Sequence, residues 1–108
     1  MKERTKSMMR AIMREDELQR IHFQDLSETD MKVIADVHGM KKVEARRFIR
    51  NIIAVVRDAF FLLVIHGYNR GTALRDMIRG GMLQSPRISE IMEVDRNPGA
   101  TMLAVGPA

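Results

Sequence analysis

Two His-Gly pairs, each placed after a run of mostly apolar residues, carry the side chains best suited to chemistry in this sequence. Asp36 and His38 stand two residues apart at the end of residues 32–37, so in a strand their side chains share one face. His66 follows the apolar run 60–65, and if the two runs are neighbouring strands it ends beside His38. Histidine exchanges protons near neutral pH and can act as a general acid or base. All three are candidate catalytic residues for phosphodiester cleavage, and the alternative is that they serve packing and turns.

The second His-Gly pair opens a segment suited to binding a phosphate group. Gly67 and Gly71 let the backbone approach a ligand closely, and the N-terminus of the helix that follows favours an anion. Arg70 and Arg75 can hold a phosphodiester through bidentate hydrogen bonds, and Tyr68 offers a ring on which a base can stack. We expect these residues to bind nucleic acid, with surface charges and an ordinary glycine turn as the alternative.

Positive charge is concentrated outside the first thirty residues. The chain of 108 residues has a net charge of +4, to which residues 1–30 contribute −1 and residues 31–108 contribute +5. A basic domain fits a polyanionic partner, although a basic protein without one has the same composition. Lys41, Lys42 and Arg46 lie at the start of a predicted helix, where positive charge opposes the helix dipole. We expect an anion to be recruited there, and solvated surface charges are the alternative.

Two predicted strands position the His-Gly pairs. Residues 32–37 and 60–65 are short apolar runs of the kind found in buried parallel strands. Between them, apolar residues recur at three- and four-residue steps from Val43 onward, which predicts a helix. The strand–helix–strand order predicts a parallel pair joined by a right-handed crossover.

The remainder of the chain adds one helix and a hairpin. The helix runs from Thr72 to a glycine stop after Arg79. Residues 88–94 and 101–105 are predicted strands, joined by a turn at 97–99. The predicted fold is therefore α/β: a two-layer sandwich with element order βαβαββ and a mixed four-stranded sheet.

The first thirty residues are predicted to form an N-terminal helical extension and linker (1–30), leaving residues 31–108 as the domain. The segment 1–24 lacks glycine and proline, and residues 25–30 are polar and turn-like. A stripe on the helix predicts partial docking on the domain, with a frayed extension as the alternative; its members are Met8, Met9, Ile12 and Met13. The chain has no cysteine and no apolar run near the ~20 residues that span a bilayer, so we expect no membrane association and a cytoplasmic location.

Several chemistries lack their motifs. The sequence has no P-loop, dinucleotide fingerprint, Gly-x-Ser-x-Gly elbow or His-Glu-x-x-His. Asp36, His38 and His66 are possible zinc ligands by type, but their spacing is not diagnostic and the basic surroundings disfavour a cation. We predict no protein metal site, and a divalent cation, Mg²⁺ or Mn²⁺, remains open as a cofactor.

Taken together, three motifs resemble the Smr (small MutS-related) domain family. They are Asp36-Val37-His38-Gly39-Met40, then Ile65-His66-Gly67 with Gly71 to Arg75, and last Asn97 to Thr101. The resemblance covers residues 33–105 and implies a fold similar to the C-terminal domain of bacterial translation initiation factor three. It also implies nucleic-acid binding and endonuclease activity on DNA or RNA, in some members on ribosome-bound messages.

The resemblance assigns roles residue by residue. It implies that Asp36 and His38 belong to the catalytic element, and that His66, Gly67 and Gly71 belong to a second loop. The family usually has Lys or Arg and then Gly after the second His-Gly, whereas this chain has Tyr68-Asn69-Arg70 there. The leading hypothesis is an Smr-type endonuclease acting on RNA somewhat before DNA. The alternatives are a non-catalytic module that binds nucleic acid or the ribosome, and a protein-interaction adaptor that uses the N-terminal helix; the oligomeric state stays open.

Overall fold

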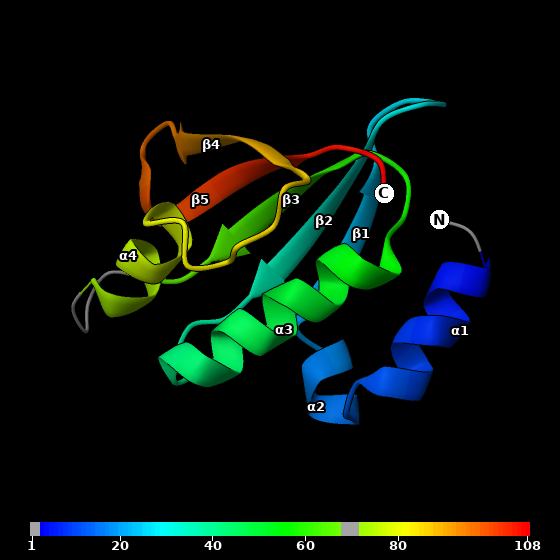
Figure 1. Cartoon of the computed structure of the whole chain (residues 1–108), viewed down its shortest axis with the longest axis horizontal. Coiled ribbons are helices and arrows are strands. Elements are labelled where there is room, and N and C mark those ends of the chain that lie inside the picture. Colours follow the sequence, from blue (N-terminus) through cyan, green and yellow to red (C-terminus); the bar gives the residue numbers. More distant parts are fainter. Residues whose placement is uncertain (1–2, 68–71) are drawn as a thin grey trace.

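A computed structural model describes residues 3–67 and 72–108 as a five-stranded sheet with helices packed on it (Figure 1). The helices are α1 (Glu3–Ile12), α2 (Glu15–Leu18), α3 (Lys42–Val55) and α4 (Ala73–Arg79). The strands are β1 (Ile21–Asp25), β2 (Met31–Asp36), β3 (Phe60–Ile65), β4 (Ile88–Val94) and β5 (Asn97–Val105), in the order β1-β2-β3-β5-β4. The β2–β3 pair is parallel and the other pairs are antiparallel, which confirms the α/β class and the mixed sheet.

The central parallel pair alternates between a buried and a half-exposed face. Val33 and Ala35 of β2 and Leu62 and Val64 of β3 are fully buried, in one core with Phe48 of α3. The residues between them on β2 and β3 keep partial solvent exposure. The helices therefore cover one face of the sheet, in agreement with the predicted two layers (Figure 1).

The N-terminal segment is more closely joined to the sheet than the sequence predicted. Helix α1 buries Met9 in the core and Met13, directly after the helix, is buried there too, while Met8 and Ile12 stay exposed. The chain then forms α2 and β1, and β1 pairs antiparallel with β2, so that Ile21 lies opposite Ala35. The sheet therefore has five strands where four were predicted, and residues 21–25 form a strand where a helical extension and linker were predicted. A strand forms there because hydrogen bonding to β2, a tertiary effect, overrides the local helical pattern.

The hairpin between β4 and β5 turns earlier than predicted. Strand β5 starts at Asn97, which pairs with Val94, so the loop consists of Asp95 and Arg96 rather than residues 97–99. Arg96 takes a positive φ of 59° in this loop. The backbone carbonyl of Gly99 accepts hydrogen bonds from the amides of His66 and Gly67, both at 2.9 Å. The strand register and this pairing place the Pro-Gly sequence inside the strand, although its local preference is for a turn.

Candidate functional site

The Asp36–His38 pair lies where β2 ends and the loop to α3 begins. The Oδ1 atom of Asp36 lies 2.5 Å from Nδ1 of His38 and also accepts a hydrogen bond of 3.1 Å from the His38 amide. An ionised carboxylate can only accept, so Nδ1 carries the proton in this pair and the lone pair of a neutral ring lies on Nε2. The His38 side chain is 65% exposed. The imidazole is therefore held at one nitrogen and open to a ligand at the other.

The parallel register brings the second His-Gly pair next to the first. The Val37 amide donates to the carbonyl of Ile65 at 2.8 Å, continuing the β2–β3 ladder past the end of β2. Gly67 follows with φ +73°, a conformation that residues with a side chain rarely adopt. A Cβ atom added at Gly67 would lie 3.7 Å from Cβ of His38. The alignment of the two strands thus brings Gly67 next to His38, whereas the sequence predicted that His66 would end there.

His66 lies behind this surface and both of its ring nitrogens have protein partners. The residue is buried, with only 5% of its surface exposed. Nδ1 lies 2.8 Å from the carbonyl of Gly67, to which it donates, so Nε2 of the neutral ring accepts from the Thr101 hydroxyl at 2.9 Å. The same hydroxyl accepts from Nε of Arg79 at 2.9 Å. Burial, followed by the positive charges of Arg79 and Arg75, lowers the pKa of His66 and favours the neutral ring.

This network predicts a stability effect of pH. The folded His66 has a lowered pKa, so below about 6.5 the unfolded chain binds a proton more readily than the folded chain does. The stabilisation that neutral His66 contributes is complete above the pKa of His66 in the unfolded chain. It declines as the pH falls toward the lower pKa of His66 in the folded chain. We expect the difference in unfolding free energy between wild type and His66→Gln to shrink between pH 7.5 and pH 5.5 in urea titrations. The matched control is His22→Gln, at an exposed position of β1, and equal pH dependence of all three proteins would contradict the assignment.

The basic residues predicted to bind nucleic acid differ in whether their charged groups already bond to other parts of the protein. Lys41 and Lys42 are exposed at the start of α3, directly after the His38 loop. Arg46 instead donates to the Met82 carbonyl at 2.7 Å and to Gln84 Oε1 at 3.0 Å, so its guanidinium anchors the loop after α4. Arg75 is partly exposed and pairs with Asp76 at 3.5 Å.

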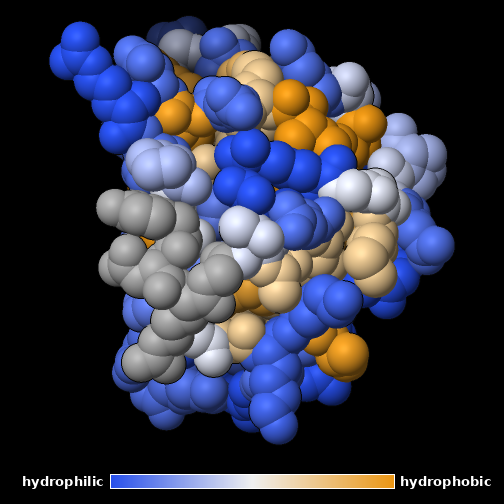
Figure 2. All heavy atoms as spheres, turned by 90° about the vertical axis from the view of Figure 1, so that its left-hand side faces the viewer, coloured by the Kyte–Doolittle hydropathy of each residue, from blue (hydrophilic) through white to orange (hydrophobic). Residues whose placement is uncertain are grey.

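Tyr68, Arg70 and Gly71, also predicted to bind nucleic acid, lie outside the described residues. The end of the molecule where β2 and β3 finish is seen in Figure 2, where hydrophilic side chains cover much of the view and apolar patches lie between them.

Three side chains of this region were missed by sequence reasoning. Arg20 donates through Nη1 to the carbonyls of Asp36 at 3.1 Å and His38 at 3.0 Å. Thr101 and Arg79 complete the network around His66. The sequence contains a weak indication that Thr101 belongs to the site, because it is a polar residue at the start of a predicted apolar strand. It contains no such indication for Arg20 or Arg79.

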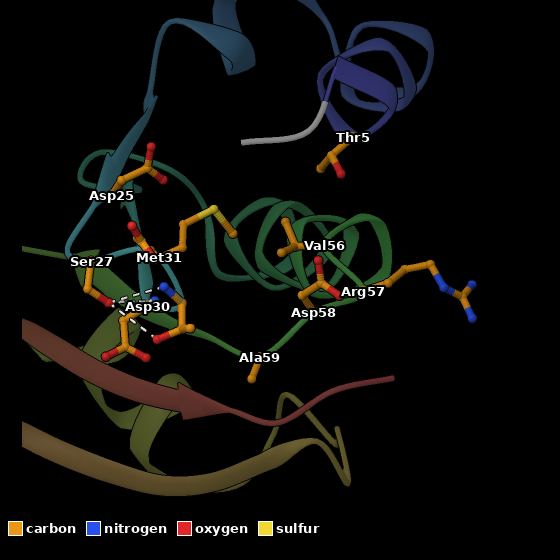
Figure 3. Close-up of a pocket in the computed structure, with 11 residues that line it drawn as sticks. Thr5, Asp25, Ser27, Asp30, Met31, Val56, Arg57, Asp58 and Ala59 are labelled. Atoms are coloured by element: carbon orange, nitrogen blue, oxygen red, sulfur yellow. Dashed lines mark hydrogen bonds between the residues drawn. The ribbon is translucent and has the colours of Figure 1, made fainter.

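A hollow of about 280 Å³ lies at the opposite end of the sheet (Figure 3). Its lining mixes polar and apolar side chains and includes the β1–β2 loop, where the Asp30 amide donates to Ser27 Oγ at 3.0 Å, and the segment around Asp58. Among the predicted site residues that the structure describes, none lines it. Within residues 3–67 and 72–108, no three histidine or carboxylate side chains converge as a metal site, and no helix is long and apolar enough to cross a membrane.

The arrangement is thus an α/β sandwich with an Asp-His pair at the carboxyl end of a central strand. A search of solved structures finds the same fold in the Smr domain of MutS2 from Thermus thermophilus, with a TM-score of 0.59 and 22% sequence identity. The match covers 68% of this chain and 98% of that domain. The sequence matches no protein-family model and no curated protein. The chain has the Smr-domain fold, which confirms the resemblance at the level of the fold.

Proposed function

We propose that this protein is an Smr-type nuclease that binds nucleic acid and cleaves a phosphodiester bond, in RNA before DNA. The observation that carries the proposal is the contact of 2.5 Å between Asp36 and His38, with the histidine ring exposed at the end of β2. A carboxylate that fixes one imidazole nitrogen leaves the other ready to act as a general base. The exposed Lys41 and Lys42 supply positive charge beside the loop, where a phosphate can be held.

The geometry fits a route through the ribose 2′-hydroxyl. His38 Nε2 takes the hydroxyl proton, the 2′-oxygen forms a bond to phosphorus, and the bond from phosphorus to the 5′-oxygen breaks. The leaving 5′-oxygen takes a proton from a water molecule, and the imidazolium of His38 then returns its proton to the solvent, so the products are a 2′,3′-cyclic phosphate and a 5′-hydroxyl. Asp36 stabilises the imidazolium that forms. His66, buried with both nitrogens bonded, has a positioning role in this scheme and supports the Gly67 turn through its bond to the Gly67 carbonyl.

The experiment is a cleavage assay on two end-labelled single strands of the same sequence, one of RNA and one of DNA. Each strand is incubated with the protein in the presence and in the absence of EDTA. We expect RNA to be cleaved with and without EDTA and the deoxy strand to stay intact. Loss of RNA cleavage in EDTA, restored by Mg²⁺ or Mn²⁺, would reject the metal-free route while keeping the nuclease. Failure to cleave single-stranded RNA, structured RNA or DNA under any of these conditions would overturn the nuclease proposal.

A second candidate is a non-catalytic module that binds structured nucleic acid or the ribosome. The observation that favours it is the row of exposed cations at the start of α3 and along its outer side, namely Lys41, Lys42, Arg47 and Arg50. Each phosphate contact made by such a cation releases counterions, so binding would weaken steeply with salt. Salt-dependent binding of labelled RNA without any product would support this candidate over the nuclease.

A further inference from the structure

Arg20, in the short link between α2 and β1, reaches the loop that carries the candidate catalytic pair. Its Nη1 atom has two hydrogens, and the carbonyls of Asp36 and His38 lie 3.1 Å and 3.0 Å away. The backbone carbonyl of Arg20 accepts in turn from the Asp36 amide at 2.9 Å. One residue of the N-terminal segment therefore holds both ends of the Asp36–His38 tripeptide.

The backbone of residues 36–38 is fully hydrogen-bonded, and Arg20 accounts for half of the bonds. The Asp36 amide, the Asp36 carbonyl and the His38 carbonyl all bond to Arg20. The Val37 amide bonds to the Ile65 carbonyl, the Val37 carbonyl accepts from Met40, and the His38 amide bonds to Asp36 Oδ1. Without the guanidinium, the Asp36 and His38 carbonyls would depend on water, and only the backbone bond from the Asp36 amide would still join this tripeptide to Arg20.

Arg20 is itself fixed from both sides. Its amide donates to the Glu17 carbonyl at 3.0 Å, and the next residue, Ile21, is buried opposite Ala35 in the β1–β2 ladder. The β1–β2 ladder starts at Ile21, so the backbone of Arg20 cannot move without breaking the pairing of β1 with β2. A rigid support of this kind sets the orientation of a catalytic side chain through the backbone that carries it.

We infer that Arg20 is a positioning residue, which fixes the loop so that the His38 ring stays against Asp36 with Nε2 free. The inference rests on the proposed function for its catalytic consequence. It makes the N-terminal segment part of the site, and it accounts for an arginine that is only partly exposed and has no acidic partner among the described residues.

The test compares Arg20→Ala with Arg10→Ala, which removes the same charge from α1 together with exposed contacts to Glu3 and Ser7. We expect kcat for RNA cleavage to fall about 10–100-fold in Arg20→Ala, with KM within about twofold of wild type. Arg10→Ala should keep both constants. Arg20→Lys keeps the charge on a flexible side chain, so its kcat should lie between those of Arg20→Ala and Arg10→Ala. It replaces Arg20→Ala in the test if that variant does not fold.

A second measurement separates this inference from the nuclease proposal. Imidazole ¹⁵N–¹H spectra should show His38 of wild type mainly with the proton on Nδ1, and a mixture of tautomers in Arg20→Ala. That change supports the positioning role even if the wild type cleaves no substrate. An unchanged His38 tautomer in a folded Arg20→Ala, or an unchanged kcat in a protein that does cleave, would overturn it.

Discussion

The His38→Ala variant is expected to cleave single-stranded RNA about 10²–10⁴-fold more slowly than wild type, which is the usual contribution of a general acid or base. His38 is exposed and its ring contacts Asp36, so truncation removes the proton acceptor without opening the core. The measurement is the single-turnover rate at saturating protein, which reports the chemical step rather than binding. Thermal unfolding should show nearly the wild-type midpoint.

Two variants sharpen this prediction. Asp36→Asn keeps the ring but replaces the carboxylate that orients it, and we expect a large loss of rate with binding retained. His22→Ala removes an exposed histidine from β1 and serves as the matched control, with the wild-type rate. If His38→Ala cleaves as fast as the control, the Asp36–His38 pair is not the catalytic element.

The Arg87→Ala variant is expected to lower the free energy of unfolding by about 3 kcal/mol, because it removes a network of charged hydrogen bonds. Arg87 lies in the loop before β4 and donates to backbone carbonyls around the end of α3 and beyond β5. The acceptors are Ile53, Val56 at 2.6 Å, Asp58 at 3.3 Å and Gly106 at 2.9 Å. The last carbonyls of a helix lack partners within it, so this guanidinium completes α3 and joins it to the sheet.

Urea unfolding followed by circular dichroism measures the effect, with a fall in Tm of roughly 10–20 °C as an independent readout. Arg87→Lys keeps the charge but lacks the planar set of donors, so we expect it to recover only part of the loss. Arg50→Ala removes an exposed arginine of α3 and should change the unfolding free energy by less than about 0.5 kcal/mol. A stable Arg87→Ala protein, indistinguishable from that control, would show that these bonds contribute little.

The sequence by itself determined the features that depend on neighbours along the chain. The apolar runs of β2 and β3 and the helical spacing of α3 predicted a parallel pair with a helix between, and the structure has it. The spacing of Asp36 and His38 predicted that their side chains lie within reach of each other, and they do, although His38 lies in the turn after β2 and not in the strand. The glycine after Arg79 ended α4 where predicted.

The tertiary structure decided whatever depends on partners far along the chain. Whether residues 21–25 form a strand depended on the exposed edge of β2, and the position of the last turn depended on pairing with β3 and β4. His66 is buried, rather than open like His38, because Thr101 and Arg79 close over it from 35 and 13 residues away. From the sequence alone, an arginine can be recognised as a positive charge, but the groups to which its guanidinium donates cannot be inferred. Arg20, Arg46 and Arg87 became supports of the fold and the site because folding placed backbone carbonyls within reach of their guanidinium groups.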